Sequence, residues 1–233
     1  MILGAECSRN CRFCAVPTAH APGPPNPDEP RELALAVQEL KLQYVVITSV
    51  TRDDLEDGGA GQFARTVQCL RRITPQVLIE LLIPDFQGRE EALSTVLSAS
   101  PDVVGHNLET VPRLTPLIRD ARASYSRSLE VLSWFSRHGA VTKTSFLCGL
   151  GESQEELMDS CQQARNAGVS HLAMGQYLAP SADHAPVVRY WTPEEFEGFR
   201  LRALAMGFQS ISAGPLVRSS YRAHDFVAPT LKR

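Results

Sequence analysis

The sequence has no apolar run long enough to cross a lipid bilayer, which takes about 20 residues. Its apolar stretches, such as 44–47 and 77–83, the second of which contains Glu80, are much shorter. The first seven residues also lack the basic region and the long apolar core of a secretory signal. We therefore expect a cytoplasmic protein without a membrane span.

An excess of basic charge is also missing. The 233 residues include 23 Lys and Arg against 26 Asp and Glu, a formal net charge of -3. Such a mixed surface offers no basic stripe to a phosphate backbone, so we expect no nucleic-acid partner. Because 43% of the residues are hydrophobic and no low-complexity run interrupts them, the chain can bury one sizeable core. We expect a single domain over residues 1–233.

Cysteines are few, six in all, far below the density of a disulfide scaffold. Three of them, Cys7, Cys11 and Cys14, lie within eight residues, and Phe13 directly precedes the third. Three thiolates in one loop suit a cubane iron–sulfur cluster, because its fourth iron then stays open to another molecule. The alternative is a structural zinc site, which would need a fourth Cys or His. His20 is the nearby candidate for that ligand.

Short β-rich runs alternate with longer amphipathic segments, which is typical of βαβ units around a parallel sheet. Capping boxes at Ser153 and Thr192 indicate two helix starts. Right-handed crossovers between parallel strands favour a partial (β/α)6, TIM-like barrel of the α/β class over a full eight-stranded barrel. The strands are expected at 2–3, 44–48, 77–82, 102–107, 141–147 and 171–175.

The cysteine spacing with its phenylalanine is the signature of radical S-adenosylmethionine (SAM) enzymes. Residues 2–16 also resemble the cysteine loop of one family among them, the lipoyl synthases, and the resemblance continues nearly to the C-terminus. Similar blocks stand at Val46–Ala60, Pro84–Gly88, His106–Pro112, Gly149–Glu152, Gly175–Leu178, Pro180–His184 and Gly214–Tyr221.

This resemblance implies an enzyme of lipoate biosynthesis with one [4Fe–4S] cluster on Cys7, Cys11 and Cys14. SAM would chelate the open iron, and its reductive cleavage would yield a 5′-deoxyadenosyl radical. By family, the radical abstracts hydrogen from an octanoyl group on a lipoyl carrier protein or domain, and sulfur enters at carbons 6 and 8. An electron donor such as flavodoxin or ferredoxin is implied as a second partner. No side chain beyond the cluster ligands is expected to be catalytic.

Candidate SAM-binding residues lie mostly where predicted strands end, the face on which barrel enzymes build active sites. Hydroxyl, amide and carboxylate groups there suit the methionine amine or the ribose. Structural alternatives stand beside them: a helix cap for Asp54, a dipole partner for Glu152, and solvated surface groups for Arg127 and Lys143. The set is Thr48, Ser49, Asp54, Asn107, Glu109, Arg127, Lys143, Gly151, Glu152, Gln176 and Tyr177. His184 and Arg218 are substrate-pocket candidates.

Residues 208–233 are expected to form a C-terminal extension with the motif Arg218-Ser219-Ser220-Tyr221. In lipoyl synthases one serine of this motif binds a second, auxiliary [4Fe–4S] cluster, so the resemblance implies Ser219 or Ser220. That cluster also takes three cysteines at C-x4-C-x5-C spacing before the radical SAM loop. The remaining cysteines of this chain, Cys69, Cys148 and Cys161, do not reproduce the spacing.

Three explanations of this departure are open. The sequence is a fragment or has a mis-set start, a partner chain supplies the missing ligands, or radical generation persists without sulfur insertion. The alternatives to lipoyl formation are therefore a degenerate protein that binds cluster and SAM without inserting sulfur, and a different radical SAM reaction on another acyl chain.

Overall fold

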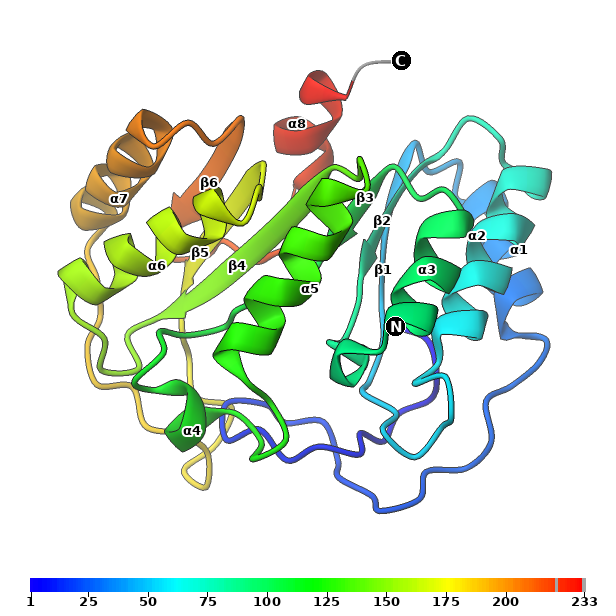
Figure 1. Ribbon diagram of the computed structural model, residues 1–233, viewed down its shortest axis with the longest axis horizontal. Helices are drawn as coiled ribbons and strands as arrows, with labels where there is room; N and C mark the ends of the chain where they lie inside the picture. Colours follow the sequence, from blue (N-terminus) through cyan, green and yellow to red (C-terminus); the bar gives the residue numbers. More distant parts are fainter. Residues whose placement is uncertain (221, 232–233) are drawn as a thin grey trace. The chain divides into compact units, whose positions relative to one another are not determined.

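The computed structural model describes residues 1–220 and 222–231, and Tyr221 of the serine motif lies outside them. Helices and strands alternate through the described part of the chain (Figure 1). Their order is α1 (Glu29–Glu39), β1 (Tyr44–Thr48), α2 (Ala60–Ile73), β2 (Leu78–Leu82), η1 (Phe86–Gly88), α3 (Glu90–Ser98), β3 (Val103–Gly105), α4 (Thr115–Ile118), α5 (Tyr125–Arg137), β4 (Thr142–Cys148), α6 (Gln154–Asn166), β5 (His171–Gln176), α7 (Pro193–Ala205), β6 (Ser210–Gly214), α8 (Ala223–Val227) and η2 (Ala228–Thr230).

The strands form a six-stranded sheet in chain order, β1 to β6. Their recorded pairings are parallel, which confirms the predicted α/β class and is consistent with a partial (β/α)6 barrel. The chain divides into two compact units. Unit 1 comprises Met1–Asn10 and Val16–Gly105, and unit 2 comprises Cys11–Ala15 and His106–Arg233.

Unit 1 contains the parallel strands β1, β2 and β3. Residues Tyr44 to Thr48 of β1 pair in register with Leu78 to Leu82 of β2. The β-branched sequence Val-Val-Ile-Thr favours this strand. Helix α2 buries one apolar face in the same unit, with Phe63, Val67 and Leu70 fully enclosed.

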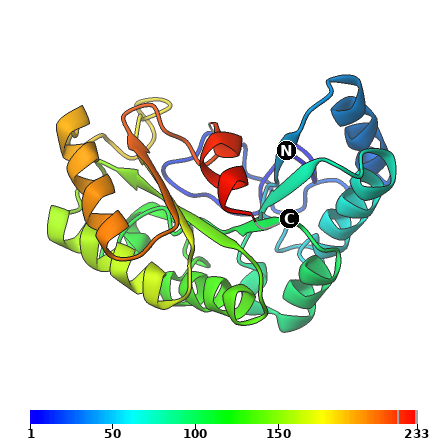
Figure 2. The ribbon, with the colours of Figure 1, turned by 90° about the horizontal axis from the view of Figure 1, so that it is seen from above.

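Unit 2 contains the parallel strands β4, β5 and β6, in which Lys143 pairs with His171 and His171 with Ser210. Helices α6 and α7 begin with the two predicted capping boxes, at Ser153 and Thr192, and both sets of reciprocal hydrogen bonds are present. Figure 2 shows α7 and α8 on opposite sides of β6.

Two details of the strand prediction were wrong. Residues 2–3 make only an isolated bridge from Ile2 to Ser49, because Leu3 has a positive φ of 70° that ends any extended run. The sixth strand is instead β6, which lies within the range 208–233 expected for the C-terminal extension. Its Ser-Ile-Ser-Ala-Gly sequence lacks the β-branched run that marked the other strands.

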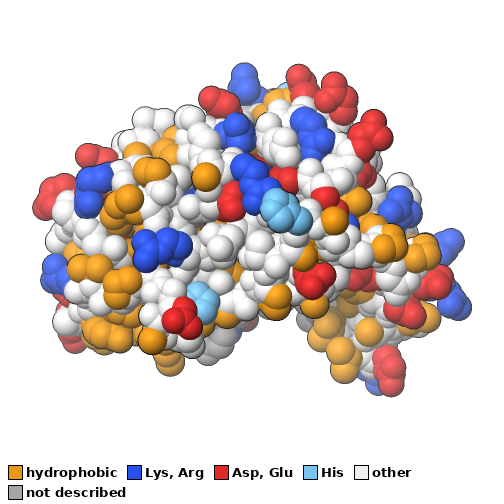
Figure 3. All heavy atoms as spheres, turned by 90° about the horizontal axis from the view of Figure 1, so that it is seen from below, with side chains coloured by type: hydrophobic (Ala, Val, Ile, Leu, Met, Phe, Trp, Pro, Cys, Tyr) orange, Lys and Arg blue, Asp and Glu red, His pale blue; other side chains and the backbone are white. Residues whose placement is uncertain are grey.

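The surface agrees with the balanced composition. On the face shown in Figure 3, acidic and basic side chains are interspersed. Among the described residues, no helix combines the length and the apolar character that crossing a membrane requires.

Candidate functional site

The first part of the cysteine loop belongs to unit 1, where backbone bonds hold Cys7. Its N–H donates to the Pro17 carbonyl at 2.8 Å, and its own carbonyl accepts from Ala19 at 3.0 Å. The backbone N–H of Arg9 donates to the Cys7 sulfur at 3.4 Å. Cys7 is a free, half-buried cysteine. Its sulfur is therefore held in place without a disulfide.

The second part of the loop belongs to unit 2. The Asp120 N–H donates to the Cys11 sulfur at 3.4 Å, and burial is the main cause that raises the pKa of Cys11 to about 11. The Cys14 N–H donates to the Cys11 carbonyl at 3.0 Å. His184, a predicted substrate-pocket residue, lies with its Nε2 3.2 Å from the Cys14 carbonyl oxygen, and its Nδ1 pairs with Ser181. His184 therefore supports the loop that carries the cysteines.

The donor chemistry of the loop fits an iron–sulfur cluster. Cys7, Cys11 and Cys14 are all half-buried, and backbone N–H groups point at the first two sulfurs. Hydrogen bonds to ligating sulfurs are among the features that tune such clusters. Among the described residues, no group of three or more His, Cys, Asp or Glu side chains is arranged to hold a single metal ion. Joint ligation by the three cysteines remains a prediction.

Ser49 follows strand β1, and its hydroxyl oxygen is buried without a hydrogen-bond partner. Such groups are uncommon in folded proteins, and an absent ligand is one explanation. Thr48 is the last residue of β1 and is half-buried. Asp54, in contrast, is already paired, because Arg52 donates to its carboxylate at 2.7 Å and lowers its pKa. Of the unit 1 candidates, Ser49 offers the clearest unmet hydrogen bond.

In unit 2, Asn107 and Glu109 show features of a polar binding site. The Asn107 side-chain oxygen is buried without a partner. Glu109 has a positive φ of 67°, and its backbone bonds on both sides to β4, at Ser145 and Leu147. Burial raises the pKa of the Glu109 carboxyl, whereas the charge of Arg119 and a hydrogen bond with Asn107 lower it. A strained backbone and an unmet acceptor together mark this turn.

The glycine-containing turn at 149–152 is organised by Glu152. Its carboxylate accepts from the N–H groups of Gly149 and Leu150, at 2.5 and 2.9 Å, and from the Trp191 indole at 3.1 Å. Gly151 has a φ of 112°, which side-chain-bearing residues rarely adopt. The carboxylate of Glu152 therefore shapes the turn from within.

Gln176 and Tyr177, at the end of β5, also use their side chains to bind backbone groups of the protein. The Gln176 amide accepts from the Trp191 N–H and donates to the Arg189 carbonyl, both at 3.0 Å. The Tyr177 hydroxyl donates to the Ala185 carbonyl at 2.8 Å. Both side chains thus hold the segment that follows β5.

The basic candidates also have protein partners. Lys143, on β4, donates to the Ser219 carbonyl at 2.6 Å, and Arg127 donates to the Arg122 carbonyl at 2.9 Å. Arg218 is exposed and donates to the adjacent Val217 carbonyl. The structure therefore brings Lys143 to the serine motif.

Of the two candidate serines in that motif, the Ser219 hydroxyl is buried without a hydrogen-bond partner, whereas Ser220 is exposed.

Sequence reasoning missed a group of buried charges in unit 1. Arg9 makes ion pairs with Asp53 at 2.7 Å and with Asp85 at 2.6 Å. The available signals were the position of Arg9 between two cysteines and the place of Asp85 in the block Pro84–Gly88. Neither signal identifies the ion pairs, because Asp53 and Asp85 lie 44 and 76 residues away from Arg9 in the sequence.

Comparisons with known proteins agree on the superfamily and the fold. The family model of the radical SAM superfamily matches residues 1–164. Among solved structures, Streptococcus suis SuiB bound to S-adenosylmethionine is similar with a TM-score of 0.70 at 9% identity, over 94% of this chain and 51% of that one. HydG, a maturase of the [FeFe]-hydrogenase, also has a TM-score of 0.70, at 12% identity over 89% of this chain and 49% of its own. At these identities the likeness concerns the fold alone.

Curated relatives are far more similar in sequence. Lipoyl synthase of Anaeromyxobacter sp. (strain Fw109-5) is 53% identical over 97% of this chain and 77% of its own length. Lipoyl synthase of Thermus thermophilus is 49% identical over 96% of this chain and 70% of its own length. The predicted resemblance is confirmed. The chain belongs to the lipoyl synthase family, enzymes of the radical SAM sulfurtransferase type that insert sulfur to form the lipoyl cofactor.

Proposed function

We propose that this chain binds a [4Fe–4S] cluster through Cys7, Cys11 and Cys14, and SAM beside it, to act on octanoyl groups carried by a lipoyl carrier protein or domain. The cysteine loop is the observation that carries the proposal. Its three cysteines are half-buried, and backbone N–H groups are aimed at the sulfurs of Cys7 and Cys11. When bound, the cluster would pass one external electron to each SAM, and each 5′-deoxyadenosyl radical so formed would take one hydrogen atom, from carbon 6 or from carbon 8.

Ser49 and Asn107 are the residues we propose for polar contacts with SAM. Each has a buried side-chain oxygen without a partner in the protein. A buried polar group left unpaired costs about 1–3 kcal/mol, and a ligand that completes its hydrogen bond recovers that energy. The Ser49 hydroxyl can donate to a carboxylate or accept from ribose, whereas the Asn107 oxygen can only accept, as from an amine or a hydroxyl.

Glu109 is proposed as a ribose ligand. Its backbone is fixed to β4 by hydrogen bonds of 3.1 Å to Ser145 and 2.7 Å from Leu147. The Glu109 backbone is therefore fixed in the turn, and a carboxylate at this position can accept from two ribose hydroxyls.

The described residues of this chain do not fit a second cluster. Cys148 and Cys161 are buried in the apolar core of unit 2, and Cys69 lies on α2 of unit 1. The unpartnered Ser219 hydroxyl could contribute one ligand, but the cysteines that would accompany it are not provided by these three positions. We therefore assign no step to an auxiliary cluster. For sulfur insertion, we propose that further ligands come from outside the described residues.

Iron and acid-labile sulfide analysis after anaerobic reconstitution tests the ligand assignment. We expect about four irons per wild-type chain, the content of one cubane cluster, and none in the triple variant Cys7→Ala, Cys11→Ala, Cys14→Ala. Cys69→Ala is the matched control and should keep its iron. Iron that survives in the triple variant would contradict the assignment.

The reaction is tested separately, with an octanoylated carrier domain and a chemical reductant. Formation of 5′-deoxyadenosine together with a mass gain for two sulfur atoms supports lipoyl formation. 5′-Deoxyadenosine without a mass gain would favour the alternative, radical generation without sulfur insertion. Addition of a separately expressed segment that carries the C-x4-C-x5-C cysteines distinguishes a missing ligand set from a lost activity.

A further inference from the structure

Arg9, between Cys7 and Cys11, is a buried side chain with only 5% of its surface exposed. Its guanidinium donates to Asp53 at 2.7 and 2.9 Å and to Asp85 at 2.9 and 2.6 Å. The two carboxylates are themselves almost free of solvent, with side-chain exposures of 9% and 0%. Two bidentate pairs on one guanidinium fix its position and its plane, which a single contact would not do.

The two carboxylates are held by the elements that carry them. The Ser8 hydroxyl accepts from the Asp53 N–H at 2.9 Å and donates to the Thr51 carbonyl at 3.0 Å. The Gln87 side chain donates to Asp53 at 3.0 Å, and the Gln87 N–H donates to Asp85 at 3.0 Å. The segment before Arg9 thus contacts the Asp53 loop through Ser8, and the turn after β2 contacts the same loop through Gln87.

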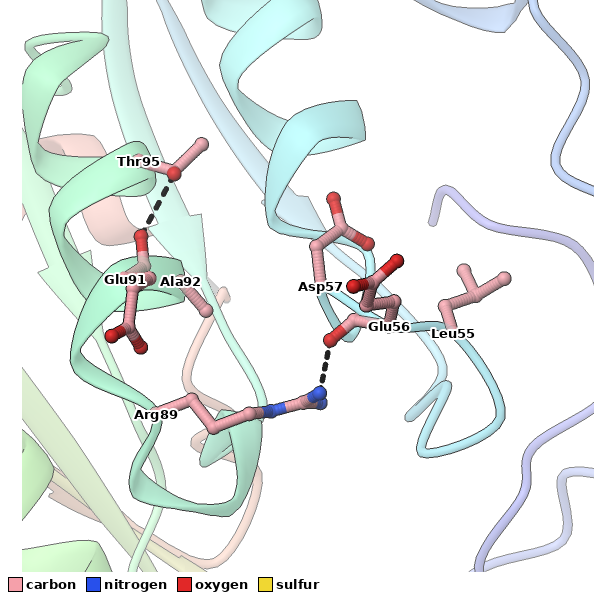
Figure 4. A pocket seen from close by; sticks show the side chains of 7 residues that line it. All are labelled: Leu55, Glu56, Asp57, Arg89, Glu91, Ala92 and Thr95. Atoms are coloured by element: carbon pink, nitrogen blue, oxygen red, sulfur yellow. Dashed lines mark hydrogen bonds between the residues drawn. The ribbon is translucent and has the colours of Figure 1, made fainter.

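A second arginine ties the loop of Asp53 to the turn of Asp85. Figure 4 shows the Arg89 side chain extending toward Glu56, whose carbonyl accepts from it, across an open groove of about 680 Å³. The Arg89 Nε also donates to the Phe86 carbonyl at 3.2 Å. Both contacts lie within unit 1. They link the two loops that hold the carboxylates of Asp53 and Asp85.

The turn after β2, which carries Asp85, has a strained backbone. Phe86 and Gln87 are consecutive non-glycine residues with positive φ, 46° and 56°. Such conformations persist where the surroundings hold them. Here the Phe86 ring is buried and meets Phe63 edge-on at 6.2 Å between centroids, and the turn presents Asp85 and Gln87 to Arg9 and Asp53.

The position of Arg9 also affects Cys7, because the two residues share a hydrogen bond. The backbone N–H of Arg9 donates to the Cys7 sulfur at 3.4 Å. Because the side chain of the same residue is gripped by two carboxylates, its backbone cannot turn away without breaking those ion pairs. Hydrogen bonds to a ligating sulfur and fixed charge nearby set the reduction potential of an iron–sulfur cluster.

We propose that Arg9 is a positioning residue for the cluster: clamped between Asp53 and Asp85, it holds its own N–H on the Cys7 sulfur and so sets the potential at which the cluster accepts an electron. The inference rests on the proposed function only in taking Cys7 as a cluster ligand. It adds a role for the Pro84–Gly88 turn, which lies far from the cysteines in the sequence.

The test compares Arg9→Gln and Arg9→Lys with wild type, by a redox titration followed through the electron paramagnetic resonance signal of the reduced cluster. Arg71→Gln is the matched control, because Arg71 also pairs with an aspartate of unit 1, Asp102 at 2.7 Å, but makes no recorded contact with residues 7–9. Thermal unfolding is recorded for every variant.

We expect the midpoint potential to become more negative in Arg9→Gln, since a donor to sulfur is loosened and a positive charge is removed. Arg9→Lys keeps the charge but cannot grip two carboxylates in a fork, so its potential should also fall, by less. Arg71→Gln should keep the wild-type potential even if its unfolding temperature drops. Loss of iron from both Arg9 variants, while they remain folded and the control stays loaded, also supports the clamp.

Wild-type potential and signal in Arg9→Lys would overturn the proposal, because charge without the two-carboxylate grip would then be sufficient. That comparison also decides the matter if Arg9→Gln does not fold. Absence of iron from the wild-type protein is a different result, and it would count against the proposed function itself.

Discussion

The Lys143 ammonium nitrogen lies 2.6 Å from the backbone carbonyl oxygen of Ser219, which joins strand β4 to the serine motif near the C-terminus. Lys143 is 4% exposed, so water does not compete strongly for this bond. A hydrogen bond from a charged donor contributes more than a neutral one. The serine motif is therefore anchored by a side chain that the sequence suggested for SAM binding.

Lys143→Met should loosen the segment around Ser219. We expect a loss of about 1.5–3 kcal/mol in the free energy of unfolding, the usual contribution of a hydrogen bond to a charged group. Limited proteolysis should show faster cleavage after residue 214. The exposed Lys41→Met is the control and should change neither quantity. An unchanged cleavage rate in Lys143→Met would mean that other contacts hold the motif.

Ser49→Ala separates a binding role from a structural one. The Ser49 hydroxyl is unpartnered and buried, so its removal should leave the free energy of unfolding unchanged or slightly higher. SAM affinity, measured by calorimetry on the reconstituted protein, should fall by about fivefold, equivalent to about 1 kcal/mol. The control Thr142→Val removes a buried hydroxyl that donates to the Gly168 carbonyl at 3.3 Å. It should lower the free energy of unfolding and leave the SAM affinity unchanged. Equal SAM affinity in wild type and Ser49→Ala would remove Ser49 from the site.

Glu152→Gln should destabilise the turn at 149–152. The carboxylate accepts from two backbone N–H groups and from the Trp191 indole. In the glutamine variant an NH2 group replaces one of the two accepting oxygens, so at least one of these donors loses its acceptor. We expect a loss of about 1–3 kcal/mol in urea unfolding, together with a shift in Trp191 fluorescence. Glu155→Gln, an exposed position on α6, is the control. Wild-type stability in Glu152→Gln would show that the turn does not depend on this carboxylate.

His171 should make stability depend on pH. Burial, and secondly the charge of Lys143, lowers the pKa of its imidazole from 6.5 to about 4. Between these values the unfolded chain binds the proton and the folded chain does not, so the free energy of unfolding falls as the pH drops from 6.5 toward 4. Below pH 4 both states bind the proton, and His171 causes no further loss. The effect amounts to at most about 3 kcal/mol.

Chemical denaturation from pH 7 to pH 4 measures this dependence. His171→Gln should flatten the part of the curve that His171 causes, whereas the exposed His20→Gln should leave it intact. An unchanged curve in His171→Gln would assign the pH dependence to other groups.

Local features of the sequence predicted local structure well. The capping boxes at Ser153 and Thr192 begin helices as expected, because their hydrogen bonds join residues three positions apart. The short β-branched run of β1 was found for the same reason. Strand β6 was missed because Ser, Ala and Gly have little preference for strands, and its pairing with β5 supplies the stability that its own sequence lacks.

The sequence by itself determined the spacing of Cys7, Cys11 and Cys14 and hence the chemistry of the loop, since thiol groups and their separation are properties of the chain. Only the tertiary structure decided that Arg9 lies between Asp53 and Asp85. Those partners are 44 and 76 residues away, and they meet because each follows a parallel strand whose end lies at the same edge of the sheet. A buried charge needs partners, but the chain alone does not say which ones, because folding brings them from distant segments.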